Sequence, residues 1–328
     1  MYGGTDQASG EGPHGARGAG ASTPVVTLDG VTVMYGRQAA LNDVTTVFGA
    51  GAVGLLGPNG AGKSTLIKAL LGFVVPHWGR MRILGLDAAQ APLEVRARVG
   101  YMPENDAYIP GMTAVTFVAY CGELSGLPPA AAMQRAHEVL FYLGLGEARY
   151  RNVETYSTGM KQRIKLAQAL VHDPDLLLLD EPTNGMDPKG RDEMLALVRD
   201  LAVNKGKHVI VSSHVLPDIE FTCTAVVVMD RGRVVAQGPI DGLKQPRGQV
   251  FELRVKAPDG LEPFVARLQA AGLACHPADD ELLRVFVPGE QGARRVFEVA
   301  SSAAVQVRHL RPSVPTLEDV FAKAMGED

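Results

Sequence analysis

The sequence of 328 residues contains no long hydrophobic run and few cysteines. Its longest apolar stretches, such as DLLLLD at 175–180, have the length of a strand and fall short of the roughly 18 residues that a transmembrane helix needs. Its 3 cysteines, Cys121, Cys223 and Cys275, show neither the paired spacing of a disulfide framework nor that of a metal site. No basic segment followed by an apolar one opens the chain, so we expect no secretory signal and a reducing, cytoplasmic compartment.

A large excess of charge of either sign is also missing. The chain carries 32 Lys and Arg against 36 Asp and Glu, which gives a formal net charge of −4. Proteins that bind nucleic acid broadly neutralise phosphates with an excess of basic side chains, so we expect no nucleic-acid partner. Hydrophobic residues make up 46% of the chain, and its length allows one large core and a second, smaller domain.

Composition divides the chain into three parts. Residues 1–24 are rich in glycine and nearly free of large apolar side chains, so burial cannot offset their ordering entropy. We expect a disordered tail there, with a residual tag or a misassigned start as the alternative. A boundary at the Pro- and Gly-containing stretch 243–249 then separates a main domain at 25–245 from a C-terminal accessory domain at 249–328.

The main domain has the alternation of an α/β protein. Alternating apolar and polar residues from Val25 predict an antiparallel strand pair or one bent strand. A buried strand at 51–57 precedes an apolar-faced helix at 64–72, and two helical patterns make a helical subdomain at about 104–160. Strands and helices then alternate, which predicts a parallel sheet flanked by helices.

The C-terminal domain has a shorter pattern of the same kind. Its apolar periodicity predicts the order β-α-β-α-β, followed by a short last helix. That helix is expected to start at Thr316, with Asp319 placed to complete a capping box.

The stretch GPNGAGKST at 57–65 follows a predicted strand and opens a predicted helix, as a Walker A phosphate-binding loop does. Glycines let backbone N–H groups close around phosphates, and the helix N-terminus adds partial positive charge. Lys63 would reach the β- and γ-phosphates, and the Ser64 hydroxyl would ligate Mg²⁺. A simple glycine-rich turn is the alternative. The predicted ATP ligands are Gly57, Pro58, Asn59, Gly60, Ala61, Gly62, Lys63, Ser64 and Thr65.

The stretch LLLLDEPT at 176–183 is a predicted buried strand that ends in two acids. Asp180 would hold Mg²⁺, as a Walker B carboxylate does. Glu181, one residue farther out, could polarise a water molecule in line with the γ-phosphate. The alternative is that one acid merely caps the turn before Pro182.

A second helix start suited to an anion lies at 157. Ser157 is a good N-cap, Thr158 adds a hydroxyl, and Gly159 leaves the backbone bare. Because the loop at 57–65 already supplies a phosphate site, this helix predicts contact with the ATP of a second copy of the chain. Two chains would then face each other, each presenting Ser157 to the other's loop.

These motifs, in this order, resemble the nucleotide-binding subunits of ATP-binding-cassette transporters over residues 25–245. The stretch YSTGM at 156–160 stands where that family carries its signature, LSGGQ. Two residues depart from it, since Thr158 replaces a glycine and Met160 replaces a glutamine. The Thr158 side chain adds bulk where backbone would approach phosphate, which predicts weaker binding in trans.

The resemblance assigns roles to four further residues. Tyr35 would stack on adenine, Asp187 would be the carboxylate of the D-loop, and His214 would contact the γ-phosphate. Glu104 occupies the Q-loop position, where most relatives have glutamine, and it would ligate Mg²⁺ with an altered site charge. A lone tyrosine before a glycine or a lone histidine after a strand is usually structural, but the order and spacing of these residues favour function.

The resemblance implies a P-loop NTPase cassette with a mainly parallel sheet, an antiparallel β region, a helical subdomain and a small C-terminal α+β domain. It implies an ATPase that uses ATP and Mg²⁺, with Glu181, His214 and Lys63 as catalytic residues. The partners would be a second ATPase subunit, in a homodimer or pseudo-dimer, and a separately encoded membrane permease. The chain would lie at the cytoplasmic face of the inner or plasma membrane, held there by the permease.

The signature, the Q-loop and PTLEDVF at 315–321 are similar to a branch of two-component exporters, whose substrates the chain itself does not specify. Two other classes stay open. A soluble cassette ATPase of DNA or ribosomes would carry long coiled coils or two cassettes, which this sequence lacks. A P-loop kinase or G-protein-like switch would leave the helix at 157 unexplained.

Overall fold

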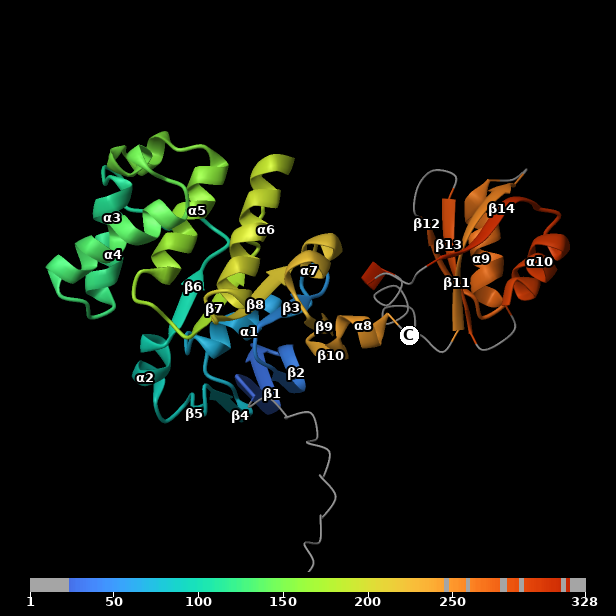
Figure 1. Cartoon of the computed structure of the whole chain (residues 1–328). Coiled ribbons are helices and arrows are strands. Elements are labelled where there is room, and N and C mark those ends of the chain that lie inside the picture. The colour runs from blue at the N-terminus through green and yellow to red at the C-terminus, as the bar shows by residue number, and fades with distance from the viewer. Residues whose placement is uncertain are drawn as a thin grey trace, which may run out of the picture.

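The computed structural model describes residues 24–244, 248–257, 260–277, 282–288, 292–313 and 317–318. Except for Pro24, the predicted tail lies outside these residues, and so do Thr316 and Asp319 of the predicted capping box. The described residues form three sheets and the helices around them (Figure 1). None of these helices is long and apolar enough to cross a membrane.

The first sheet is antiparallel and has the strand order β2-β1-β4-β5. The residues from Val26 form a single strand with several register shifts, so the bent-strand alternative is confirmed and the strand pair is not. Alternating side chains of β1 are buried because one face of this sheet packs into the core. The strands are β1 (Val26–Tyr35), β2 (Gln38–Phe48), β4 (Trp78–Ile83) and β5 (Leu86–Asp87).

The second sheet has six strands in the order β10-β9-β3-β8-β7-β6. All neighbours are parallel except β10, which pairs antiparallel with β9. The apolar runs of β3 and β7 are buried along their whole length, because helices cover both faces of a parallel sheet. The strands are β3 (Ala52–Leu56), β6 (Val99–Met102), β7 (Leu176–Asp180), β8 (His208–Ser213), β9 (Ala225–Asp230) and β10 (Arg233–Pro239).

Helices lie between or after the strands of this sheet along the chain. They are α1 (Lys63–Leu70), α2 (Pro92–Ala97), α5 (Thr158–Leu170), α6 (Pro188–Val203), α7 (Leu216–Thr222) and α8 (Ile240–Leu243). The helical region between β6 and α5 contains α3 (Ala114–Leu124), α4 (Pro129–Tyr142) and two 3₁₀ turns (Glu147–Tyr150 and Val153–Thr155). Thr113 caps α3 by accepting a hydrogen bond from the Thr116 backbone N–H.

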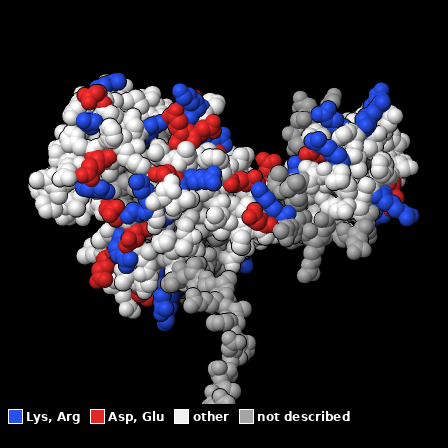
Figure 2. Space-filling model, viewed as in Figure 1, with Lys and Arg blue, Asp and Glu red and all other residues white. Residues whose placement is uncertain are grey.

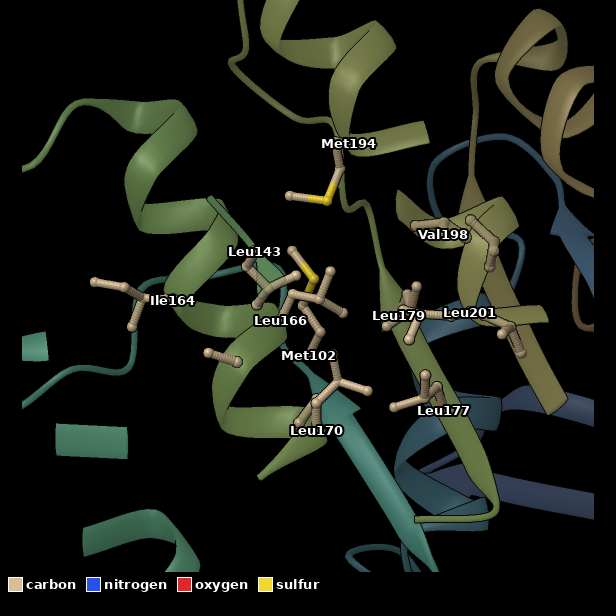
Figure 3. Packing of buried hydrophobic residues seen from close by; sticks show 14 of the residues in the cluster. Met102, Leu143, Ile164, Leu166, Leu170, Leu177, Leu179, Met194, Val198 and Leu201 are labelled. Atoms are coloured by element: carbon tan, nitrogen blue, oxygen red, sulfur yellow. The ribbon is translucent and has the colours of Figure 1, made fainter. Parts of the chain in front are cut away.

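Apolar side chains join β6 and β7 to α5 and α6 (Figure 3). Leu177 and Leu179 are fully buried on one face of β7, and burial of each contributes about 1.5–3 kcal/mol. The helix that begins at Ser157 is therefore anchored to the central sheet. The labelled members of this cluster are Met102, Leu143, Ile164, Leu166, Leu170, Leu177, Leu179, Met194, Val198 and Leu201.

The C-terminal residues form a third, antiparallel sheet with the order β12-β13-β11-β14 and two helices. The prediction missed β12, because four residues that end in proline carry no clear period of two. With β12 the order β-α-β-β-α-β is that of a ferredoxin-like unit. Its elements are β11 (Gly248–Lys256), α9 (Leu261–Ala270), β12 (Ala274–Pro277), β13 (Leu282–Pro288), α10 (Gly292–Ser302) and β14 (Gln306–Ser313).

One contact returns from the C-terminal end to the main domain. Leu317 is 1% exposed and belongs to the core cluster beneath α7. Its backbone N–H donates to Glu220 on α7 at 2.7 Å, and Lys244 pairs with the same carboxylate at 3.1 Å. Leu317 therefore connects the predicted last helix to the region of α7.

Candidate functional site

A cavity of about 750 Å³ lies at the carboxyl edge of the parallel sheet, beside the antiparallel sheet. The carboxyl ends of parallel strands and the helix starts that follow them are where α/β proteins commonly bind ligands. Predicted site residues line this cavity: Tyr35, Pro58, Asn59, Gly60, Ala61, Gly62, Lys63, Ser64, Thr65, Glu104, Asp180, Glu181 and His214. Gly57 is not part of the lining but accepts a hydrogen bond from Lys63.

The loop between β3 and α1 packs against the backbone of two other strands. A Cβ atom at Gly57 would lie 2.4 Å from the Met229 carbonyl oxygen, and one at Gly62 would lie 2.7 Å from that of Ala40. Both glycines also have positive φ, +155° and +103°. Only glycine fits these two positions without strain, so the loop keeps a shape that leaves its backbone open to the cavity.

Lys63 is the first residue of α1, yet its side chain turns back along the loop. Its Nζ atom donates to the carbonyl oxygens of Gly57 at 2.6 Å and Pro58 at 3.2 Å. Burial lowers the pKa of Lys63, while the nearby Glu181, Asp180 and Glu104 carboxylates act in the opposite direction. The ammonium group is thus held at the loop, next to three acids and within the cavity.

Asp180 and Glu181 are placed by the end of β7. Both are buried, with 4% and 8% of their surface exposed. Burial raises the pKa of Asp180, and the charges of Glu104 and Glu181 raise it further, whereas the charge of Lys63 lowers it. A cation in the cavity would relieve this crowding of negative charge.

Glu181 combines a strained backbone with a defined side-chain contact. Its φ is +50°, a left-handed value that residues with a side chain rarely adopt. Its backbone N–H donates to the Ser212 carbonyl oxygen at 2.9 Å, which ties the residue to β8. Its Oε2 atom lies 3.0 Å from Nδ1 of His214, directly after β8. The carboxylate and the imidazole can therefore act together on a group in the cavity.

Glu104 and Tyr35 line the cavity from two different sheets. Glu104 lies two residues beyond β6, and its carbonyl oxygen accepts a hydrogen bond from Lys165 at 2.6 Å. Tyr35 is the last residue of β1 and is 53% exposed, so its aromatic side chain is accessible to a planar ligand.

The sequence prediction missed several lining residues. The turn between β9 and β10 donates from Gly232 N–H to the Ala61 carbonyl oxygen at 3.0 Å, which holds the phosphate loop from the far side. Glycine in a tight turn was visible in the sequence, but nothing there related the turn to residues 57–65. The missed residues are Gln38, Ala39, Ala40, Asn184, Arg231 and Gly232.

The start of α5 does not reach this cavity. Ser157 and Gly159 line a separate hollow of about 420 Å³ together with Asp187, at the start of α6. Ser157 is the predicted N-cap, since its hydroxyl accepts a hydrogen bond from the Met160 backbone N–H. Thr158 lines neither hollow and lies against Gly185. The structure thus divides the predicted site residues between two surfaces.

The residues of the first cavity fit a magnesium ion bound with phosphates. The Ser64 hydroxyl and the carboxylates of Glu104 and Asp180 are hard oxygen donors that line the same space. Among the described residues, no group of three or more His, Cys, Asp and Glu side chains could hold a metal ion alone. Mg²⁺ in proteins usually takes one or two carboxylates and completes its shell with phosphates and water.

Comparisons with known proteins agree with this geometry. A family model described as ABC transporter matches residues 41–184. The linearmycin resistance ATP-binding protein LnrL of Bacillus subtilis is 36% identical over 92% of this chain and 98% of its own. The daunorubicin/doxorubicin resistance ATP-binding protein DrrA of Streptomyces peucetius is 32% identical over 93% of each chain.

Solved structures show the same likeness. The ATP-binding subunit of an ABC transporter is 30% identical, with a TM-score of 0.61 over 67% of this chain and 92% of its own. A dimeric bacterial ABC transporter cassette is 25% identical, with a TM-score of 0.60 over 65% of this chain and 98% of its own. The phosphate loop, the two acids at the end of β7 and the relatives that match over most of their length lead to one conclusion: the chain belongs to the ABC transporter family, as an ATP-binding subunit that hydrolyses ATP.

Proposed function

We propose that two copies of this chain close on two ATP molecules and use hydrolysis to power export through a separate membrane permease. The observation that carries this proposal is the division of the phosphate-binding features between two surfaces. One cavity has the loop, the lysine and the acids, and a separate hollow has the capped helix start at Ser157. Neither surface surrounds a nucleotide alone, whereas two facing copies would complete both sites.

The side chains of the first cavity suggest distinct tasks. Lys63 would stay with the phosphates and balance charge that develops on the γ-phosphoryl group. Glu181 would orient and polarise the attacking water, and His214, which lies 3.0 Å from it, would hold the γ-phosphate. Tyr35 would stack on adenine. Asp187, in the second hollow, would contact the opposing copy at the same interface.

Magnesium would be held by Ser64, Glu104 and Asp180, where it would neutralise phosphate charge during transfer. Burial, together with the charges of Glu104 and Glu181, raises the pKa of Asp180, and a bound cation would favour its ionised form.

The membrane part of the proposal has two supports. Relatives of known role include resistance proteins and Nod factor export ATP-binding proteins, all similar over most of this chain. On α3, beyond Glu104, Tyr120 and Leu124 are one helical turn apart and are 40% and 70% exposed. A permease loop that covered this apolar face would hold the chain at the cytoplasmic side of the membrane and would sense Glu104.

The central test uses the Glu181→Gln variant, in which we expect hydrolysis to fall at least about 100-fold while ATP binding persists. The trapped form should elute as an ATP-dependent dimer in size-exclusion chromatography with light scattering. Adding Ser157→Arg should abolish the dimer but leave ATP bound to the monomer, whereas Lys63→Ala should abolish ATP binding. Glu94→Gln, on the exposed face of α2, is the control.

A dimer that persists in the Ser157→Arg variant would exclude the shared site. For the permease, tagged Glu181→Gln protein should be recovered with ATP from gently solubilised native membranes. A multi-spanning membrane protein that is lost with Lys63→Ala supports the exporter, whereas soluble partners alone would contradict it.

A further inference from the structure

Two lysines lie on one face of α5, the helix that Ser157 caps. Lys161 and Lys165 are four residues apart, so their side chains leave the same side of the helix one turn apart. Both reach the segment 104–108, which follows β6 and carries Glu104. Neither lysine lines the nucleotide cavity or the second hollow.

Lys165 is the deeper of the two and is only 4% exposed. Its Nζ atom donates to the backbone carbonyl oxygen of Glu104 at 2.6 Å. Burial lowers the pKa of Lys165, and the charges of Asp106, Glu104 and Asp180 oppose that shift. A buried ammonium group is tolerated only where such partners compensate its lost hydration, so the segment and the helix stabilise each other here.

Lys161 holds the far end of the same segment. Its Nζ atom lies 3.2 Å from the Tyr108 hydroxyl and 3.4 Å from an Asp106 carboxylate oxygen. It also lies 5.1 Å from the centre of the Tyr108 ring, within the range of a cation–π contact. The segment is thus attached to α5 at three of its residues.

The remaining faces of α5 connect it to the rest of the cassette. Gln162 donates to the Asn184 carbonyl oxygen at 2.8 Å, three residues after Glu181. Arg163 donates to the Leu143 carbonyl oxygen at 2.7 Å and pairs with Glu193 on α6. The helix therefore links the two surfaces, because its N-cap residue Ser157 lies at one and its flank holds Glu104 at the other.

We propose that Lys161 and Lys165 form a clamp that positions the segment 104–108, so that Glu104 and Ser157 move together. The lysines are positioning residues, because they line neither the nucleotide cavity nor the second hollow. A displacement of Glu104 at one ATP would pass through α5 to the Ser157 surface that serves the other ATP. This inference rests on the proposed function for its consequence, whereas the contacts of the clamp itself lie within one chain.

The first measurement concerns the clamp alone. Full-length protein without nucleotide is treated with chymotrypsin, and cleavage after Tyr108 is compared with cleavage after Tyr150, which is 52% exposed on the surface. The Lys165→Met variant loses the hydrogen bond from the Lys165 ammonium group to the Glu104 carbonyl oxygen. Because the segment 104–108 should then open more often, we expect cleavage after Tyr108 to become about 10-fold faster or more. Lys161→Met should act in the same direction, and Lys256→Met, at an exposed position on β11, should not.

The second measurement is a double-mutant cycle on ATP turnover with Glu104→Ala. If Lys165 acts by positioning Glu104, Lys165→Met lowers kcat severalfold in the wild-type background and has little further effect in Glu104→Ala. If Lys165 has a purely structural role, the effects of Lys165→Met and Glu104→Ala on kcat multiply in the double variant, and that result overturns the proposal. Unchanged cleavage after Tyr108 in both lysine variants overturns it as well. Failure of the ATP-sandwich proposal would appear separately, as a dimer insensitive to Ser157→Arg.

Discussion

The positive φ of Glu181 predicts which of two variants at this position, Glu181→Gly or Glu181→Ala, is the more stable. With φ at +50°, any L-residue at this position pays a steric penalty of about 1–2 kcal/mol that glycine avoids. Glu181→Gly and Glu181→Ala both remove the carboxylate and its contact with His214. The difference in stability between these two variants therefore reports the backbone alone.

The expected magnitude follows from two opposing effects. Glycine gains about 1–2 kcal/mol by relief of strain but loses about 0.5–1 kcal/mol, because its unfolded chain is more flexible. We expect Glu181→Gly to be more stable than Glu181→Ala by about 0.5–1 kcal/mol. At Gln134, an exposed position inside α4, the order should reverse, with glycine about 1 kcal/mol less stable than alanine.

Equilibrium urea unfolding of the four variants, followed by circular dichroism, measures both differences. Nucleotide must be absent, since a ligand that binds only the folded state would add its own stabilisation. If the alanine variant at 181 is as stable as the glycine variant while the Gln134 pair behaves as expected, position 181 is not strained and the argument fails. Confirmation would show that the chain holds strain at the residue proposed to orient the attacking water.

Three further outcomes are expected. Leu179→Ala leaves a cavity in the fully buried face of β7 and should lower the free energy of unfolding by about 2–5 kcal/mol in urea titrations; a loss below about 1 kcal/mol would contradict the packing. Gly62→Ala places a methyl group 2.7 Å from the Ala40 carbonyl oxygen, so equilibrium dialysis should show ATP affinity reduced about 10-fold or more, and wild-type affinity would refute the close approach. Hydrogen bonds from Arg311 and Ser313 hold the pKa of Glu252 below its ordinary value of 4.5. The ionised carboxylate therefore stabilises the folded state above that pH, and this stabilisation is lost as the pH falls through the lowered pKa. Glu252→Gln should therefore unfold more easily than wild type near neutral pH, and the gap should close in acid; a gap independent of pH would exclude the ionised carboxylate as its source.

The charge distribution is in line with the sequence. Basic and acidic side chains are interspersed on the cassette face seen in Figure 2, without a wide field of one sign. The strongest charge–charge interactions are expected among the buried acids and lysines near β6 and β7, where water screens them least.

Much of the cassette could be predicted from the sequence because its elements are locally encoded. Apolar runs such as 176–179 predicted buried strands, and the glycines of 57–62 predicted a phosphate loop, since each depends on neighbouring residues only. The cap at Ser157 was predicted for the same reason. The short strand β12 was not, because four residues hold too little periodicity.

Tertiary structure decided which of these local pieces meet. The turn at 231–232 reaches the phosphate loop only because β9 pairs with β3, about 170 residues away in sequence. The positive φ of Glu181 and the burial of Lys165 follow from packing at the sheet edge, which no local pattern encodes. The sequence by itself determined the helices and strands and the functional residues they carry. The pairing of distant strands decided which residues adopt a strained backbone conformation and which charged side chains are buried together.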